Sequence, residues 1–292
     1  MKGSVLAAAA VAISLLGASS ARAQDEVFDS GRLLATGGVT EIEGAGGGGL
    51  VPWALITGYG SRDGVGVNAH ATYVPLTDFS LLTEGVAVGL YDRLELSYAH
   101  QTFDTGDAGA RLGLGKGFKF DQDIVGAKVR LFGDAVFDQD SWLPQVAAGV
   151  QYKMNDRGTI IHAIGGSHDD GTDYYLAATK LFLAERVLLN VTLRETEANQ
   201  YGILGFGGDN GGYSTQVESS AAFLATRWLA LGAEYRTKPD NLKFAKEDDA
   251  FDLFVAAFFN KNVSLTLAYV DLGDIALQGR QNGAYMSLQV GI

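Results

Sequence analysis

The histidines and serines are the first residues to test for catalytic chemistry. The four histidines are His70, His100, His162 and His168, and none stands at a metal-ligand spacing such as HExxH. Ser97 lies three residues before His100, so in a strand the two side chains would point to opposite faces. A serine hydrolase needs its hydroxyl and imidazole within hydrogen-bond reach. His100 with a serine from another strand is therefore the remaining candidate for a membrane-embedded lipid hydrolase.

A second group of residues carries charge at alternate positions of apolar segments. These residues share one face by alternation, and they are the candidate lumen-lining set: Arg93, Glu95, Lys128, Arg130, Lys153, Arg194, Glu234 and Arg236. Two roles are open for them. They could form salt-bridged pairs that fill a narrow lumen, or a ring of charge that filters solutes. Neither role requires a catalytic residue, a cofactor or a metal ion, and we expect none of these.

The elements that must position these charges are β-strands. Apolar and polar residues alternate with period two along almost the whole chain, as in Leu94, Leu96 and Tyr98, which alternate with Arg93, Glu95 and Ser97. A helix would instead place apolar residues three and four apart. Twelve segments are predicted as strands, near 66–75, 83–90, 93–102, 122–132, 145–153, 173–183, 187–196, 214–225, 228–237, 250–259, 263–272 and 283–292. Residues 36–43 and 53–60 could add a pair and make fourteen, or could fold into or under the lumen.

The alternation fits two architectures. A soluble barrel buries its apolar residues, whereas an outer-membrane barrel turns them toward lipid and keeps small and polar residues inside. The polar faces here are rich in Gly, Ala, Ser and Thr, which suits a crowded lumen. Several apolar faces end in a tyrosine, as an aromatic girdle would require: Tyr73, Tyr98, Tyr152, Tyr235 and Tyr269. The sequence therefore favours an all-β fold, a transmembrane antiparallel up-and-down β-barrel of about 12 strands, with 14 as the alternative.

The connections between the segments support this orientation. Short polar turns precede the segments that begin near residues 93, 187, 228 and 263. Longer loops rich in Gly and Asp occupy 104–121, 155–172, 197–213, 238–249 and 273–282. Outer-membrane barrels have short periplasmic turns and longer outer loops. The alternation of connection lengths therefore fits an outer-membrane barrel, and the even strand count is what a bacterial barrel with both termini on the periplasmic side requires.

The first 23 residues have the order of a secretory signal peptide. A basic start at Lys2 precedes an apolar run over 5–16, and Ala21 and Ala23 supply small residues for cleavage before Gln24. We expect residues 24–292 to form one barrel domain in the outer membrane of a Gram-negative bacterium. Within it, 24–65 is a Gly-rich N-terminal segment that could be a luminal plug or a first strand pair.

Composition limits the partners. The chain has a net charge of −12, and an acidic chain repels nucleic acid. It contains no Cys, which excludes disulfides, thiolate metal sites and cysteine nucleophiles. The expected partners are outer-membrane lipid and lipopolysaccharide. The end of the chain, from Gln281 through Gly283, Met286 and Leu288 to Ile292, resembles the C-terminal signal that barrel-assembly machinery recognises, although Ile292 replaces the usual terminal aromatic residue.

The N-terminal glycine segment carries the most distinctive pattern. Gly44 to Gly49 lacks the Lys-Ser or Lys-Thr of a phosphate-binding loop. The run TGGVTEIEGAGGGGLVPW over 36–53, with the segments 56–60, 85–93 and 95–99, resembles the signature of an uncharacterised proteobacterial family of outer-membrane β-barrels. The resemblance covers essentially the whole mature chain. It implies a location and a fold, and it brings no catalytic residues.

Three functions remain open at this point. The leading hypothesis is a porin-like channel that passes or binds small solutes or hydrophobic molecules. The second is a closed barrel with a structural role in the envelope, and the third is an outer-membrane lipid hydrolase. A barrel of eight strands is filled by side chains and one of 16 leaves a channel, so a barrel of 12 to 14 does not decide between the first two.

Overall fold

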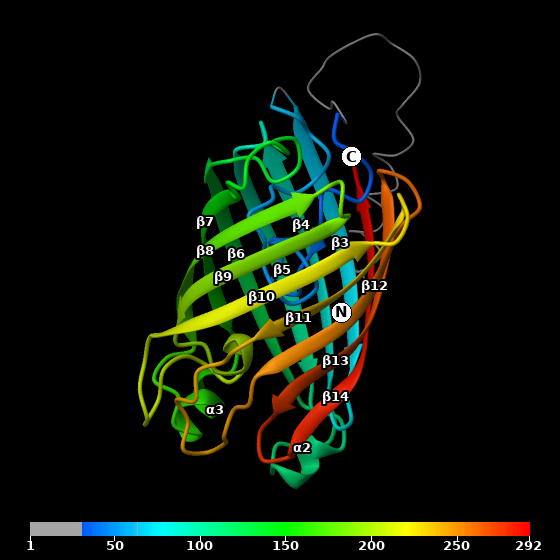
Figure 1. The fold of residues 1–292 in the computed structure, drawn as a ribbon. Coiled ribbons are helices and arrows are strands. Elements are labelled where there is room, and N and C mark those ends of the chain that lie inside the picture. The colour runs from blue at the N-terminus through cyan, green and yellow to red at the C-terminus, as the bar shows by residue number, and fades with distance from the viewer. Residues whose placement is uncertain (1–30, 63) are drawn as a thin grey trace.

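The barrel wall consists of twelve antiparallel strands (Figure 1). The computed structural model describes residues 31–62 and 64–292, so the predicted signal peptide lies outside the described residues. The strands are β3 (Val65–Pro75), β4 (Ser80–Leu90), β5 (Leu94–Asp104), β6 (Lys119–Phe132), β7 (Gln145–Asn155), β8 (Asp170–Phe182), β9 (Val187–Thr196), β10 (Ser214–Leu224), β11 (Leu229–Arg236), β12 (Ala250–Phe258), β13 (Val263–Asp274) and β14 (Arg280–Gly291).

Each strand pairs with its neighbours in sequence, and the last strand closes the ring on the first. Met286 of β14 lies opposite Tyr73 of β3, and Leu288 lies opposite Ala71. The prediction of a twelve-stranded up-and-down barrel is confirmed. The fourteen-strand alternative is wrong, because residues 36–43 and 53–60 add no strand to the wall. Their region contains a two-residue ladder between β1 (Val39–Thr40) and β2 (Gly46–Gly47) and an isolated bridge between Gly47 and Pro52.

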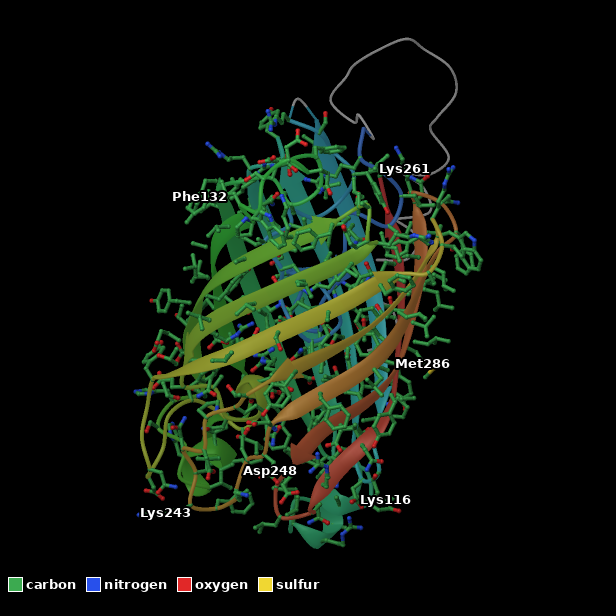
Figure 2. The ribbon with its side chains drawn as sticks, in the orientation of Figure 1. Lys116, Phe132, Lys243, Asp248, Lys261 and Met286 are labelled. Atoms are coloured by element: carbon green, nitrogen blue, oxygen red, sulfur yellow. The ribbon has the colours of Figure 1, made fainter. Side chains whose placement is uncertain are left out.

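The wall has the polarity opposite to that of a water-soluble protein. On β5, Leu96 is 48% exposed whereas its neighbour Glu95 is 1% exposed. On β9, Leu193 is 46% exposed whereas Arg194 is fully buried. Figure 2 shows Met286 pointing outward from the middle of the wall. Exposing apolar side chains to water while burying charges would be unfavourable twice over. The outward face therefore requires an apolar surrounding.

The two ends of the barrel differ. At the end where Arg32 and the C-terminus lie, the strands are joined by the connections 91–93, 183–186, 225–228 and 259–262, together with the longer 133–144. The opposite end carries the short connections 76–79 and 275–279 and four longer ones, three of which hold α2 (Ala108–Arg111), α3 (Gly158–Ala163) and the 3-10 helix η2 (Asn199–Gly202). Among the described residues, no helix is long and apolar enough to cross a membrane.

Residues 35–60, here called the inner segment, run inside the ring of strands (Figure 1). Nearly all of them are buried. Their backbone groups bond to side chains from opposite parts of the wall, including Glu95 of β5, Thr179 of β8 and Glu234 of β11. Arg32 donates to the carbonyl oxygens of Ile56 and Gly58. Gly37, near the start of the inner segment, also lies beside the Gly58 carbonyl oxygen, so the start and the end of the segment lie close together, at the end of the barrel that carries the C-terminus.

Candidate functional site: the lumen

Glu43 of the inner segment lies where three basic side chains of the wall converge. Arg236 of β11 donates through Nη1 to Glu43 Oε2 at 2.7 Å, and Arg194 Nη2 of β9 lies 3.6 Å from the same oxygen. Lys153 of β7 pairs with Oε1. These four side chains are almost completely buried. Because isolated charges are costly to bury, this convergence fixes the position of the inner segment.

Two wall carboxylates complete this group. Asp173 of β8 pairs with Lys153 at 2.7 Å and with Arg194 at 3.1 Å. Glu218 of β10 pairs with Arg194 at 2.6 Å and with Arg236 at 3.1 Å. Each acid therefore bridges two bases. We call these six residues the ion-paired cluster: Glu43, Lys153, Asp173, Arg194, Glu218 and Arg236.

Glu95 and Lys128 of the wall form a second pair of charges, which bonds the backbone of the inner segment at Gly46, Trp53 and Thr57. Glu95 accepts hydrogen bonds from the backbone N–H groups of Gly46 and Thr57, at 2.9 and 2.8 Å. Lys128 lies 3.0 Å from Glu95 and donates to the carbonyl oxygens of Gly46 and Trp53. The two side chains thus bond four backbone groups of the buried segment, of which the Gly46 carbonyl oxygen also accepts a hydrogen bond from the Trp53 N–H.

Glu234 holds the next part of the inner segment. It accepts hydrogen bonds from the Leu50 N–H at 2.6 Å and from the Ser220 hydroxyl at 2.7 Å, and the same hydroxyl accepts one from Trp53 Nε1. A side chain on Gly48 would overlap the Glu234 carboxylate, so glycine is required for this close approach. Here the backbone of the inner segment packs directly against a carboxylate of the wall.

Asp252 lies directly opposite Glu234 on the neighbouring strand and also faces the lumen. It is 1% exposed, and neither of its carboxylate oxygens has a hydrogen-bond partner within residues 31–62 and 64–292. In this described part of the chain neither acid forms an ion pair. We call Glu234 and Asp252 the acid pair.

Glu41 and Glu43 stand two residues apart and differ in their partners. Glu41 accepts hydrogen bonds from the Glu43 N–H at 3.1 Å, from the Ala45 N–H at 3.3 Å and from Gln151 Nε2 at 2.8 Å. Burial, together with the nearby Glu43 carboxylate, raises the pKa of Glu41 to about 8. Glu41 is therefore mostly protonated at neutral pH, whereas Glu43 carries the charge that meets the bases.

The long-loop end is closed by the connection between β9 and β10. The carbonyl oxygen of Tyr201, in η2, accepts hydrogen bonds from Gln122 Nε2 at 3.1 Å and from Lys153 Nζ at 3.3 Å. The Tyr201 ring lies 4.4 Å from the Arg236 guanidinium. Lys153 and Arg236 therefore touch both the inner segment and this loop, and the two closures meet at the ion-paired cluster.

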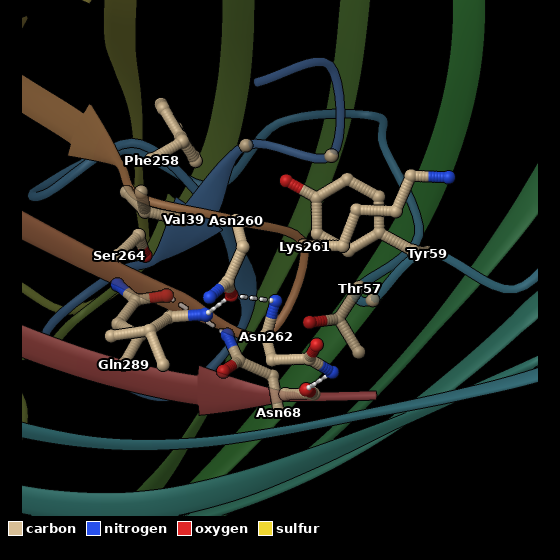
Figure 3. A pocket seen from close by; sticks show the side chains of 15 residues that line it. Val39, Thr57, Tyr59, Asn68, Phe258, Asn260, Lys261, Asn262, Ser264 and Gln289 are labelled. Atoms are coloured by element: carbon tan, nitrogen blue, oxygen red, sulfur yellow. Dashed lines mark hydrogen bonds between the residues drawn. The ribbon is translucent and has the colours of Figure 1, made fainter. Parts of the chain in front are cut away.

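Two cavities beside the inner segment are both small. One cavity of about 30 Å³ lies where the inner segment meets β3, β14 and the turn 259–262, among polar side chains that include Asn68 and Gln289 (Figure 3). A second, of about 20 Å³, lies beside Trp53 and Phe254. A cavity of this kind needs roughly 10–15 Å³ to hold one water molecule. These cavities hold a water or two, and neither admits a solute.

Of the eight candidate residues, the structure places seven on the inner face and brings six of them to the inner segment: Glu95, Lys128, Lys153, Arg194, Glu234 and Arg236. Arg130 faces the rim, where it pairs with Asp92 and Asp134. Arg93 lies outside the set, because it belongs to the exposed turn before β5 and donates to the Leu131 carbonyl oxygen at 3.5 Å. Figure 2 marks further charges, such as Lys116 and Asp248, at the long-loop end and not in the lumen.

The sequence did not single out three acids of the lumen. Asp173, Glu218 and Asp252 lie on alternating segments, so the same period-two count would have found them. Glu43 could not be found in this way, because the glycine run around it has neither the period of a strand nor that of a helix.

The hydrolase candidate His100 faces outward. Its Nδ1 lies 2.9 Å from Asp123 Oδ1, and its Nε2 lies 3.9 Å from Asp121. The two hydroxyls beside it are already engaged, since Tyr98 donates to Asp123 and Thr102 donates to Asp121. Ser97 faces the lumen, as the alternation predicts. Both ring nitrogens of His100 therefore face carboxylates, Asp123 and Asp121, and not a serine hydroxyl that could act as a nucleophile.

Comparison with known proteins gives one family match. The model of a family described as "Protein of unknown function (DUF3034)" matches residues 36–289. No curated protein matches the chain. Among solved structures, the chain is similar to a KdgM porin (8% identity, TM-score 0.47, covering 77% of this chain and 98% of that one). It is also similar to a NanC porin (12%, 0.45, 77% and 97%) and to outer membrane phospholipase A from Escherichia coli (10%, 0.42, 77% and 95%). At this level of similarity the function has to be inferred from the chain's own geometry.

Proposed function

Because the chain belongs to the DUF3034 family of proteins of unknown function, whose match includes the glycine signature over 36–53, we propose its function from its own geometry. We propose an integral outer-membrane β-barrel whose lumen is a solute passage closed at rest by the inner segment. The observation that carries this proposal is the inner segment itself, which is buried across the lumen and bonded to opposite strands of the wall.

The outward face supports the membrane part of this proposal. Tyrosines, together with Phe251, occupy it toward the long-loop end, and Phe or Trp side chains occupy it toward the end with the C-terminus: Tyr73, Tyr98, Tyr152, Tyr174, Tyr235 and Tyr269, against Phe132, Phe182, Phe223, Trp228 and Phe259. On β8, Tyr174 and Phe182 lie about 26 Å apart along the strand at roughly 3.3 Å per residue. Strand tilt shortens this separation along the barrel axis to about 20 Å, close to the apolar band of an outer-membrane barrel.

The same geometry suggests an orientation. Outer-membrane barrels place their short turns and both termini in the periplasm. The inner segment would then enter from the periplasmic side, and the loop that carries Tyr201 would close the outer side. The lipid and lipopolysaccharide partners, and recognition of β14 by barrel-assembly machinery, belong to this proposal.

Single-channel recording in a planar bilayer tests the proposal. The mature chain should give no discrete current steps, because its cavities hold a water or two. A variant lacking residues 35–60 should give steps, since the ends of the segment already lie close together at Arg32. Heat-modifiable migration on a gel would show that both forms are folded. The matched control deletes residues from the exposed loop 105–118 and should remain silent.

Two results would contradict the proposal. Conductance by the intact chain would mean that the lumen is open at rest. A deletion variant that is folded and remains silent would show that the inner segment does not close a passage, and would favour the closed structural barrel.

A further inference from the structure

The balance of charge in the ion-paired cluster points to a ligand. Three wall bases, Lys153, Arg194 and Arg236, meet only two wall acids, Asp173 and Glu218. The third acid, Glu43, comes from the inner segment. Without Glu43, the three wall bases face two wall acids, so the site has an excess of one positive charge. Such an excess favours an anion as the third partner.

The shape of the site suits a carboxylate. Glu43 presents one oxygen to Lys153 and the other to Arg236 and Arg194. The two arginines are held in place by other contacts. Arg194 donates to Glu218 and lies 5.3 Å from the Tyr175 ring, and Arg236 lies against the Tyr201 ring. Guanidinium groups fixed in this way offer their remaining N–H groups in the planar arrangement that carboxylates match.

We propose that Lys153, Arg194 and Arg236 form a carboxylate-binding site in the lumen wall, and that Glu43 occupies it as a tethered ligand. The ligand class is a small carboxylate-bearing solute, which would compete with Glu43 and so favour release of the inner segment. This proposal rests on the proposed function, since it assigns the substrate class of the passage that the inner segment closes.

Glu43→Ala in the full mature chain provides the test. The substitution vacates the site and leaves the wall bases in place, so the variant should refold poorly from urea into detergent when chloride is the only anion. Acetate at equal ionic strength should restore the folded, heat-modifiable fraction severalfold, in a saturable manner, because a ligand that binds only the folded state stabilises it by mass action. The wild type should not respond, because its own carboxylate fills the site.

Glu41→Ala is the matched control. Glu41 is equally buried, lies two residues away and forms no ion pair within the described ranges. Its removal should bring no response to acetate. An equal acetate response of the wild type, Glu41→Ala and Glu43→Ala, or no response of a folded Glu43→Ala, would overturn the proposal.

If Glu43→Ala does not fold in either salt, a second pair of variants tests the proposal. Glu43→Gln keeps the volume of the side chain and removes its charge, whereas Glu43→Gln with Lys153→Met also removes one base. If the site is a balance of three bases and three acids, the double variant should give a larger folded fraction than the single one. A smaller folded fraction would overturn the proposal. Both assays measure folding and not current, so a silent 35–60 deletion would contradict the proposed function without deciding this result.

Discussion

Two neighbouring regions of the lumen handle buried charge in opposite ways. In the ion-paired cluster each of the six charges contacts at least one opposite charge, and Arg194 alone pairs with Glu43, Asp173 and Glu218. In the acid pair, Glu234 and Asp252 lie opposite each other on β11 and β12 without a base. Arg236 stands two residues from Glu234 and pairs toward the cluster. The comparison indicates that the first region holds the inner segment by ion pairs, whereas the second holds it only by hydrogen bonds to Glu234.

Removal of Arg194 should have the largest effect on this comparison. Arg194→Ala leaves three buried acids short of a partner, and breaking a buried ion pair typically costs about 3–5 kcal/mol. We expect a loss of this size in the free energy of unfolding, measured from the urea midpoint in lipid vesicles. Arg194→Lys should lose less, because one charge remains while the two-pronged contact with Glu218 is lost. A loss below 1 kcal/mol for Arg194→Ala would mean that the cluster does not hold the inner segment.

Contact between the inner segment and the acid pair can be tested at Gly48. A Cβ there would overlap the Glu234 carboxylate, which is held by Leu50 and Ser220. Overpacking of this kind typically costs about 1–3 kcal/mol, so Gly48→Ala should lower the urea midpoint accordingly. It should also produce brief current steps in a bilayer, if the inner segment is displaced. Gly211→Ala, in an exposed loop, is the control and should change neither measurement.

The difference between these regions also explains what the sequence could predict. Period-two alternation determines which side chains of Leu94 to Asp104 face inward, because a strand turns successive residues to opposite faces. The twelve strands and most of the inner charges follow from this rule. The rule depends on strand geometry, and therefore it fails at Arg93, which belongs to a turn.

The partner of each inner charge could not be predicted in the same way. Glu43 and Arg236 are 193 positions apart, and they meet only because the ring closes around a segment without regular structure. The sequence also could not exclude the fourteen-strand alternative, because the position of residues 36–43 depends on contacts between distant parts of the chain. Residues 36–43 alternate weakly, and the competition between joining the wall and filling the lumen is decided by tertiary contacts, such as those of Glu95 with Gly46 and Thr57.

Glu41 should give the inner segment a dependence on pH. Its pKa is raised to about 8 when folded, from an ordinary value of 4.5. Between these values the unfolded chain releases a proton that the folded chain keeps, so this residue's contribution to stability is complete below pH 4.5 and is lost as the pH rises toward 8. The urea midpoint of the wild type should therefore fall from pH 5 to pH 8. Glu41→Gln should flatten this fall, and an unchanged slope would show that Glu41 is not the titrating group.

Substitution of Asp252 should change the free energy of unfolding least. It tests most directly whether the acid pair and the ion-paired cluster differ. Asp252→Asn replaces one of two acidic groups that face each other and supplies an N–H donor to Glu234, so stability should be unchanged or higher by up to about 1 kcal/mol. Asp173→Asn makes the same chemical change in the ion-paired cluster, where the aspartate pairs with Lys153 and Arg194. Its expected cost is about 3–5 kcal/mol, because two buried bases lose a partner. The urea midpoints of the two variants, refolded under the same conditions, give the difference between their losses in stability. Equal losses would show that the acid pair has partners of its own, and that the two regions hold the inner segment alike.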